Sequence, residues 1–254
     1  ASLSIPTATS LRTIPVKILD ENRQLINKYL TTNSKPKISY THIIAWAIVK
    51  ALAKFPSINT SFARVNGEPY KDEKPEINIG IAVDVTKKDG SRSLLVPNIK
   101  SANVMNFEEF FHAYDSIIQK ARKASLAPTD FQSTTITLTN PGTVGTVSST
   151  PRLMPGQGAI IATGSIGYDA AHQTVSPEIL SALGISKVMT MTCTYDHRVI
   201  QGAESGQFLA YIHTLLLGEE NFYMQIFSDL KIPFAPFQFS ANTNSFSLPI
   251  QQFL

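Results

Sequence analysis

The segment from residue 41 to residue 55 is apolar on nearly every side when it is placed on a helix. It is interrupted by Lys50 and Lys54 and stops at Pro56, which cannot continue a helix because it lacks an amide hydrogen. The segment is too short and too charged to cross a bilayer, which takes about 20 apolar residues. Such a helix must be covered by other elements, so we expect it to lie under a sheet.

Other helices are predicted where apolar residues recur at intervals of three and four. They cover residues 16–30, 107–124, 202–217 and 221–230. Ser39 or Thr41 can cap the apolar helix, and Asn106 can cap the helix that follows it at residue 107, because short polar side chains accept hydrogen bonds from the first free amides.

Strands are predicted at residues 62–65, 77–85, 93–96, 133–139, 158–163 and 187–195. The Asp-Gly turn within residues 87–90 favours pairing of the strands on either side of it. In the last strand, Met189, Met191, Cys193 and Tyr195 alternate with threonines, so one face should meet the core and the other should be polar. These elements together predict a mixed α+β fold.

The domain organisation expected from the sequence is simple. A small, polar N-terminal arm at residues 1–15 precedes one globular domain at 16–232, and a Pro- and Phe-rich tail or linker follows at 233–254. The single cysteine, Cys193, excludes an internal disulfide framework, and with no recognisable export signal we expect a reducing cytoplasm.

Charge and motif spacing argue against several functions. The net charge of +3 is far from the clustered excess that binds nucleic acid. The glycines do not follow a strand in the spacing of a dinucleotide or phosphate-binding loop. The remaining histidines lack cysteines or paired carboxylates at ligand spacing, so no metal site is predicted.

The chemically informative segment follows the last predicted strand and reads YDHRVIQGA at residues 195–203. It resembles the DHRxxDG signature of the dihydrolipoyl acyltransferases of 2-oxoacid dehydrogenase complexes, which share the fold of chloramphenicol acetyltransferase. Residues 136–142, ITLTNPG, are similar to the family's FTxSNxG segment, and residues 9–12, TSLR, resemble its entry segment, whose arginine begins the first helix. On its own, a histidine after a strand would more often be a surface or core residue.

The segments PGTVGTV and PRLMPGQGAI resemble the fused actinobacterial-type 2-oxoglutarate dehydrogenases, in which this acyltransferase domain precedes a thiamine-dependent decarboxylase. The resemblance implies a trimeric, chloramphenicol acetyltransferase-like mixed sheet flanked by helices. It also implies a succinyl cargo, coenzyme A as the second substrate, and a lipoyl group carried on a separate domain. The implied partners are that lipoyl domain, the decarboxylase and dihydrolipoamide dehydrogenase, with no nucleic acid or membrane.

The resemblance also implies residue roles. His197 would be the base for the thiol of coenzyme A, because an unassisted thiol loses its proton only near pH ~8.5. Thr139, where the family commonly has serine, would stabilise the oxyanion, facing His197 across a subunit interface, and Arg12 would contact a phosphate of coenzyme A. The residues expected to support the site are Asp196, Arg198, Asn140, Gly142, Gly202 and Gln201.

One position departs from the family pattern. The acid expected four residues after the histidine is Gln201 here, so any ion pair made by that acid is absent. A neutral amide can still support the loop by hydrogen bonding. Two alternatives stay open: a catalytically weak core that organises a complex, and a free-standing acetyltransferase that acts on a small molecule.

Overall fold

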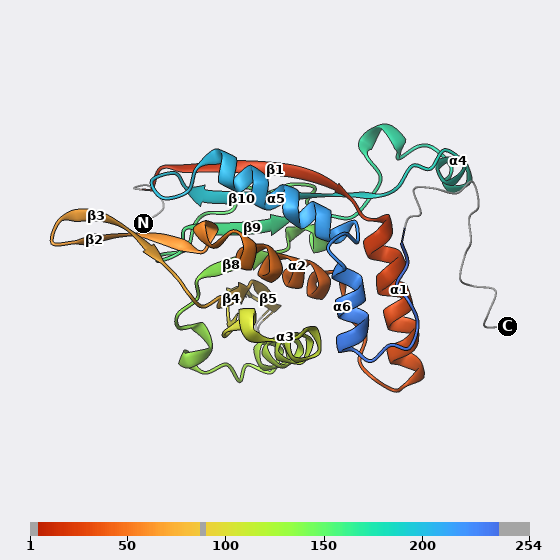
Figure 1. Cartoon of the computed structure of the whole chain (residues 1–254), viewed down its shortest axis with the longest axis horizontal. Helices are drawn as coiled ribbons and strands as arrows, with labels where there is room; N and C mark the ends of the chain where they lie inside the picture. Colours follow the sequence, from red (N-terminus) through yellow and green to blue (C-terminus); the bar gives the residue numbers. More distant parts are fainter. Residues whose placement is uncertain (1–4, 87–89, 239–254) are drawn as a thin grey trace.

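The computed structural model describes residues 5–86 and 90–238 (Figure 1). Its centre is a six-stranded mixed sheet with the order β1-β10-β9-β8-β4-β7. Strands β4, β8 and β9 are parallel, whereas β10, β1 and β7 are each antiparallel to a neighbour. The strands are β1 Thr7–Pro15, β4 Ile79–Ile81, β7 Asn98–Ile99, β8 Ile136–Thr139, β9 Ala159–Thr163 and β10 Val188–Asp196. The expected mixed α+β fold is therefore confirmed.

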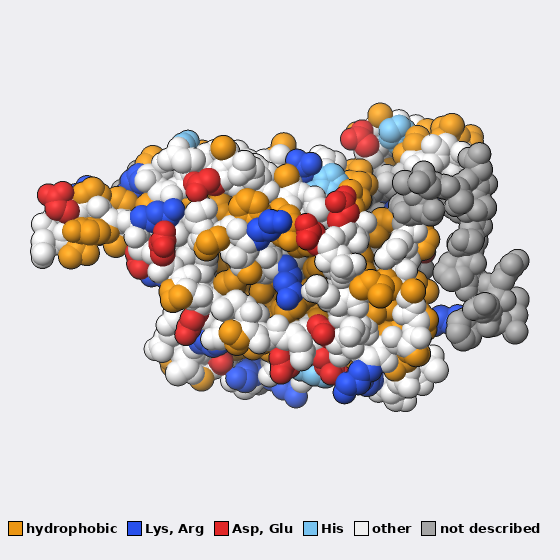
Figure 2. Space-filling view, in the orientation of Figure 1, with side chains coloured by type: hydrophobic (Ala, Val, Ile, Leu, Met, Phe, Trp, Pro, Cys, Tyr) orange, Lys and Arg blue, Asp and Glu red, His pale blue; other side chains and the backbone are white. Residues whose placement is uncertain are grey.

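Helices α2 and α5 lie side by side over one face of this sheet (Figure 1). The helices are α1 Lys17–Thr32, α2 Tyr40–Lys54, α3 Phe107–Arg122, α4 Pro177–Ala182, α5 Gly202–Leu216 and α6 Phe222–Asp229. All predicted helices are present, and the short α4 was missed. Helix α2 is buried nearly all round, which confirms its predicted place under the sheet. Figure 2, in the orientation of Figure 1, shows acidic and basic side chains interspersed over this face of the molecule.

The predicted strand at residues 77–85 is in fact two strands. Ile79–Ile81 is buried in the main sheet, whereas β5 Val83–Thr86 leaves it and pairs with β6 Arg92–Leu95. The chain divides here because β4 is enclosed by its neighbours, while β5 alternates half-buried with exposed residues. The predicted pairing across the Asp-Gly turn is confirmed, although residues 87–89 of that turn lie outside the described residues.

A second hairpin projects from the body of the fold (Figure 1). It consists of β2 Thr60–Val65 and β3 Glu68–Glu73, and β2 contains the predicted strand at 62–65. Among the described residues, no helix is both long and apolar enough to pass through a membrane.

Most of the expected N-terminal arm forms β1, an edge strand that pairs with β10 along its whole length. Arg12 therefore lies in a strand, which corrects the expectation that it begins the first helix, since α1 starts at Lys17. The threonine face of β10 is polar as predicted but largely buried. Thr192 donates to the carbonyl of Ser149 (2.6 Å), and the hydroxyl groups of Thr194 and Thr9 are 2.9 Å apart.

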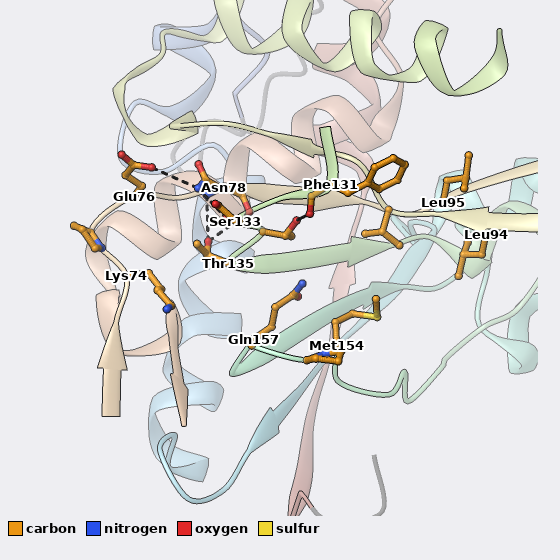
Figure 3. A pocket seen from close by; sticks show the side chains of 15 residues that line it. Lys74, Glu76, Asn78, Leu94, Leu95, Phe131, Ser133, Thr135, Met154 and Gln157 are labelled. Carbon is orange, nitrogen blue, oxygen red and sulfur yellow. Dashed lines mark hydrogen bonds between the residues drawn. The ribbon is translucent and has the colours of Figure 1, made fainter. Parts of the chain in front are cut away.

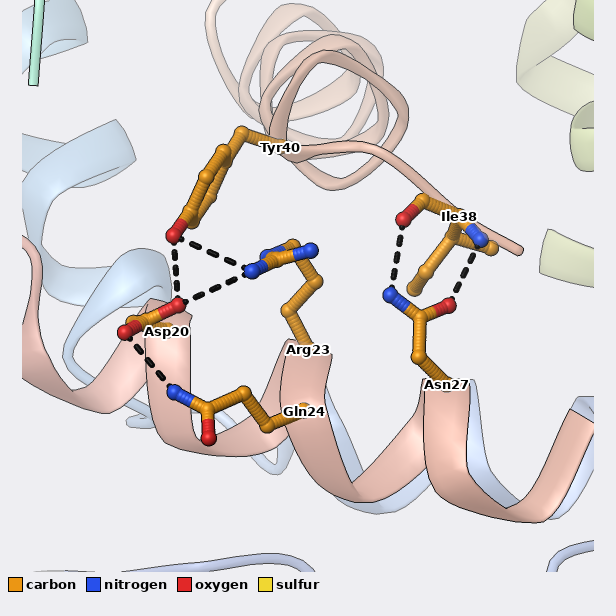
Figure 4. Close-up of polar contacts among 6 residues, drawn as sticks. All are labelled: Asp20, Arg23, Gln24, Asn27, Ile38 and Tyr40. Carbon is orange, nitrogen blue, oxygen red and sulfur yellow. Dashed lines mark hydrogen bonds and ion pairs between the residues drawn. The ribbon is translucent and has the colours of Figure 1, made fainter. Parts of the chain in front are cut away.

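Polar contacts fix the start of α2 to α1 (Figure 4). The hydroxyl of Tyr40 donates to Asp20 (2.5 Å), and Arg23 donates to both. Asn27 pairs with the backbone of Ile38 through two hydrogen bonds of 3.0 and 2.8 Å. Burial alone would raise the pKa of Asp20, but the hydrogen bonds from Tyr40 and Arg23 outweigh it and lower that pKa. The segment that enters α2 is thus held in one place.

Candidate active site

His197 lies in a rigid turn directly after β10. The carboxylate of Asp196 is 2% exposed and accepts hydrogen bonds from the Arg198 backbone (3.0 Å) and guanidinium (2.6 to 3.2 Å). The amide of Asp196 donates to Gly158 (2.8 Å), and that of His197 donates to Pro6 (2.9 Å). Backbone and side-chain contacts therefore hold the chain on both sides of the imidazole, as expected if Asp196 and Arg198 stiffen the turn.

The imidazole itself is exposed in the single chain. Its ring centroid lies 5.6 Å from that of Tyr195, and it makes no hydrogen bond to another described residue. Arg198 is held from the other side, because its guanidinium lies 3.7 Å from the centre of the Phe62 ring. The geometry leaves the imidazole nitrogens of His197 available for proton transfer.

Gln201 and Gly202 lie at the start of helix α5, four and five residues after His197. Gln201 is the N-cap residue of this helix. Its side chain is exposed, and its backbone N–H donates to the carboxylate of Glu204 (2.8 Å). A Cβ on Gly202 would lie 3.3 Å from the hydroxyl of Tyr195, so the glycine allows that close approach. Both residues shape the turn that follows His197.

Thr139 ends β8 and lines a cavity of about 770 Å³. Its neighbour Asn140 also lines this cavity and donates from its side-chain amide to the hydroxyl of Thr41 (3.1 Å). Thr41 in turn is hydrogen-bonded to Tyr114, whose pKa is raised by burial to about 12. We refer to this space as the Thr139 cavity. Its floor is fixed by contacts that join the end of β8 to α2 and α3.

A backbone contact positions the loop after Thr139. Gly142 lies so close to the next strand that a Cβ would be 2.3 Å from the carbonyl carbon of Gly164. Any larger residue would push the segment Pro141–Val144 away from β9. This close approach explains why a glycine is required at a predicted supporting position.

Ser39, His42 and Asp115 form a hydrogen-bonded array that also lines the Thr139 cavity. The backbone N–H of Ser39 donates to Nδ1 of His42 (3.0 Å), so that nitrogen is an acceptor and the proton is on Nε2. Nε2 then donates to Asp115 (3.1 Å). Because Nδ1 already accepts from an amide, His42 holds α2 against α3 and is not a free base. Sequence reasoning missed this array, since no local motif links residues 73 positions apart.

Within one chain, His197 and Thr139 are far apart. Thr139 pairs with Ala162 of β9, which pairs with Thr192 of β10. His197 lies five residues beyond Thr192, which corresponds to about 16 Å along the strand. The two predicted catalytic residues are thus at opposite ends of the sheet and cannot act on one thioester from a single chain.

Arg12 lies between the sheet and α5, and its Nε donates to Nδ1 of His213 (2.8 Å). Burial lowers the pKa of His213, and the charge of Arg12 lowers it further. Arg12 does not line the Thr139 cavity. Its predicted contact with coenzyme A stays a prediction.

A second cavity, of about 720 Å³, lies at the other end of β8 (Figure 3). Asn78 is fixed there by hydrogen bonds to Ser133 (2.9 Å) and Thr135 (3.1 Å). Met154 and Phe131 give it partly exposed apolar walls. None of the predicted site residues lines it, so we assign the candidate site to His197 and the Thr139 cavity. Within residues 5–86 and 90–238, no group of three metal-ligating side chains occurs.

Comparison with known proteins identifies relatives of this chain. Residues 1–224 match the family model described as 2-oxoacid dehydrogenases acyltransferase (catalytic domain). The chain is 51% identical over 236 residues to the multifunctional 2-oxoglutarate metabolism enzyme of Mycolicibacterium vanbaalenii. That match covers 93% of this chain but 19% of the relative, so the chain spans about a fifth of the length of such relatives.

Solved structures with a similar fold include the dihydrolipoamide acetyltransferase of Azotobacter vinelandii. Its TM-score is 0.69 at 24% identity, and the match covers 90% of this chain and 85% of that one. That structure was used to investigate the roles of a serine, a histidine and an asparagine in catalysis. Chloramphenicol acetyltransferase matches with a TM-score of 0.50 at 12% identity, covering 84% of this chain and 89% of that one. The expected chloramphenicol acetyltransferase-like fold is confirmed.

Proposed function

Because the chain belongs to the 2-oxoacid dehydrogenase acyltransferase family, we propose that it moves a succinyl group between a dihydrolipoyl thioester and coenzyme A. The observation that carries this proposal is the exposed imidazole of His197 on a turn held by the Asp196–Arg198 ion pair. The succinyl group is supported by relatives named for 2-oxoglutarate metabolism, since loss of carbon dioxide from 2-oxoglutarate leaves a four-carbon acyl unit with a distal carboxylate.

His197 acts as the general base in this proposal. It takes the proton from the thiol of coenzyme A, and the resulting thiolate attacks the carbonyl carbon of the acyl-dihydrolipoyl thioester. Thr139 donates its hydroxyl hydrogen to the oxyanion of the tetrahedral intermediate. When the carbon–sulfur bond to the dihydrolipoyl group breaks, His197 returns the proton to the departing sulfur. The reverse transfer uses the same residues in the opposite order.

The active site would be completed between two copies of the chain. His197 and Thr139 are separated within one chain, so a second copy must bring its Thr139 to the first copy's His197. We infer a trimer, in which each of three interfaces holds one site. The Thr139 cavity, at about 770 Å³, falls within the ~300–1,000 Å³ typical of small-molecule sites and suits an acyl thioester arm.

The other implied partners are part of the same proposal. A lipoyl domain would deliver the acyl group from a thiamine-dependent decarboxylase, and dihydrolipoamide dehydrogenase would reoxidise the lipoyl group, all in the cytoplasm. The matched relatives are about five times longer than this chain, which leaves room for such domains in them.

Gln201 would keep a structural role at the start of α5. In the Azotobacter protein the asparagine under study follows the histidine by four positions, the same offset that separates Gln201 from His197. An amide at this position is thus compatible with an acyltransferase, which supports the enzyme over a silent scaffold.

Arg12 would contribute a charged contact to coenzyme A. Replacing it with alanine should raise the KM for coenzyme A, because a charged hydrogen bond to phosphate is lost. An unchanged KM would limit Arg12 to its contact with His213.

The function is tested by following acyl transfer from succinyl-coenzyme A, and separately acetyl-coenzyme A, to dihydrolipoamide. The native chain should transfer succinyl, and His197→Ala should not. A preference for acetyl would shift the proposal to a pyruvate-type complex. No transfer by the native chain would favour the scaffold, whereas transfer to a hydroxyl or amine but not to a thiol would favour a free-standing acetyltransferase.

A further inference from the structure

One cationic side chain of the Thr139 cavity, that of Arg122, has no ion-pair partner among the described residues. Two aspartates and two arginines line the cavity. Asp84 forms an ion pair with Arg92, and Asp115 accepts a hydrogen bond from Nε2–H of His42. Among the described residues, Arg122 makes no hydrogen bond or ion pair. Within the part of the chain that the structure describes, Arg122 is therefore a cavity cation that pairs directly with neither of the cavity's two carboxylates.

Arg122 lies on the face of α3 that borders the cavity. Tyr114, Ile118 and Arg122 recur every four residues, and all three line it. Arg122 is two turns from Tyr114, about 12 Å along the helix axis, and its long side chain can span part of that distance. Burial and, to a lesser extent, the charge of Asp115 raise the pKa of Tyr114, whereas the charge of Arg122 lowers it, so both charges act on the Tyr114 hydroxyl.

Hydrogen bonds connect Tyr114 to the residue beside Thr139. Tyr114 is hydrogen-bonded to Thr41, and Thr41 accepts from Asn140, the residue after Thr139. An acyl group whose carbonyl oxygen meets Thr139 would direct its other end into this cavity. An apolar acyl group would leave Arg122 without a partner, whereas a distal carboxylate would supply one.

We propose that Arg122 binds the distal carboxylate of the acyl group and so selects thioesters of short dicarboxylic acids over simple fatty acyl thioesters. This inference rests on the proposed function and identifies the residue that sets its substrate class. Arg92 contributes less, because Asp84 already pairs with it. Arginine suits this role because its planar guanidinium can make two parallel hydrogen bonds to one carboxylate.

The test is the ratio of kcat/KM for succinyl-coenzyme A to that for acetyl-coenzyme A, with dihydrolipoamide as acceptor. Arg122→Ala should lower this ratio by about 10- to 100-fold, since a hydrogen-bonded charge pair to the substrate is lost. Arg122→Lys should recover part of the ratio, because it keeps the charge but not the fork-shaped geometry.

The matched control is Lys123→Ala, which removes a cation from the adjacent, exposed position at the end of α3 and does not line the cavity. Its succinyl-to-acetyl ratio should equal that of the native chain. Equal losses with both donors in Arg122→Ala would overturn the inference and point to a phosphate of coenzyme A. A native preference for acetyl would also overturn it while keeping the acyltransferase, and transfer of neither group would remove the proposed function itself.

Discussion

His197 and Thr139 lie at opposite ends of the main sheet, one after the last residue of β10 and the other at the carboxyl end of β8. The pairing of Thr139 with Ala162, and of Ala162 with Thr192, fixes this separation through the backbone rather than through flexible loops. A side-chain rotation cannot close a gap of about five strand residues, or about 16 Å. If both residues act on one thioester, they must come from different chains.

Subunit complementation tests this consequence. Neither His197→Ala nor Thr139→Ala should be active alone, but co-expression of the two should restore activity. In randomly mixed trimers, each site takes its histidine and its threonine from independent copies, so about a quarter of the sites should be intact. Transfer of succinyl to dihydrolipoamide measures the recovery.

The control is to mix the two variants after each has assembled separately, which should restore little activity until subunits exchange. If co-expression gave no more activity than the sum of the two single variants, a site shared between chains would be wrong.

Thr139 should contribute mainly to the chemical step. Thr139→Ala should lower kcat by about 10² to 10³, because one oxyanion donor is lost, while the KM for coenzyme A changes little. Thr139→Ser keeps the hydroxyl and should remain within a few-fold of native activity. Thr13→Ala, on the exposed face of β1, is the matched control and should have native kinetics. A loss in Thr139→Ser as large as in Thr139→Ala would show that the methyl group, not the hydroxyl, matters.

Thr41 should act as a positioning residue, because its hydroxyl accepts the hydrogen bond from Asn140. Thr41→Val keeps the shape but loses that contact, worth about 1 kcal/mol, so kcat should fall about fivefold. Thr41→Ser should restore kcat. Thr32→Val removes a hydroxyl contact on the exposed end of α1 and serves as the control. If Thr41→Val lowered thermal stability but not kcat, the contact would be structural only.

Several features of the fold and site follow from local sequence. The apolar run of α2 leaves almost no polar side to face solvent, so its burial could be predicted. The position of His197 follows from an alternating strand and the turn after it. The family resemblance, rather than periodicity, supplied its expected role.

Other features depend on contacts that local patterns do not encode. The contact between Asn140 and Thr41 joins residues 99 positions apart, and the array of Ser39, His42 and Asp115 depends on how α2 packs against α3. The division of β4 from β5 was missed because both halves have the same alternating pattern. Which half joins the main sheet is decided by the neighbouring strands.

The pair of Arg12 and His213 should make stability depend on pH. Burial, and then the charge of Arg12, lower the pKa of His213 in the folded chain. The unfolded chain therefore binds the proton more tightly, with a pKa of about 6.5. This contribution to the free energy of unfolding is fully present above that value and declines as the pH falls toward the folded pKa.

Urea unfolding at several pH values between 8 and 5 measures this decline, with the pH range chosen to span the ~6.5 of an unperturbed histidine. His213→Gln cannot titrate and should lose less stability than the native chain over the same range. Arg12→Gln removes the charge but keeps an amide that can donate to Nδ1, so the pKa of His213, followed by NMR, should rise toward its usual value. An unchanged pKa in Arg12→Gln would assign the whole shift to burial, and an identical pH dependence in His213→Gln would exclude His213 as its source.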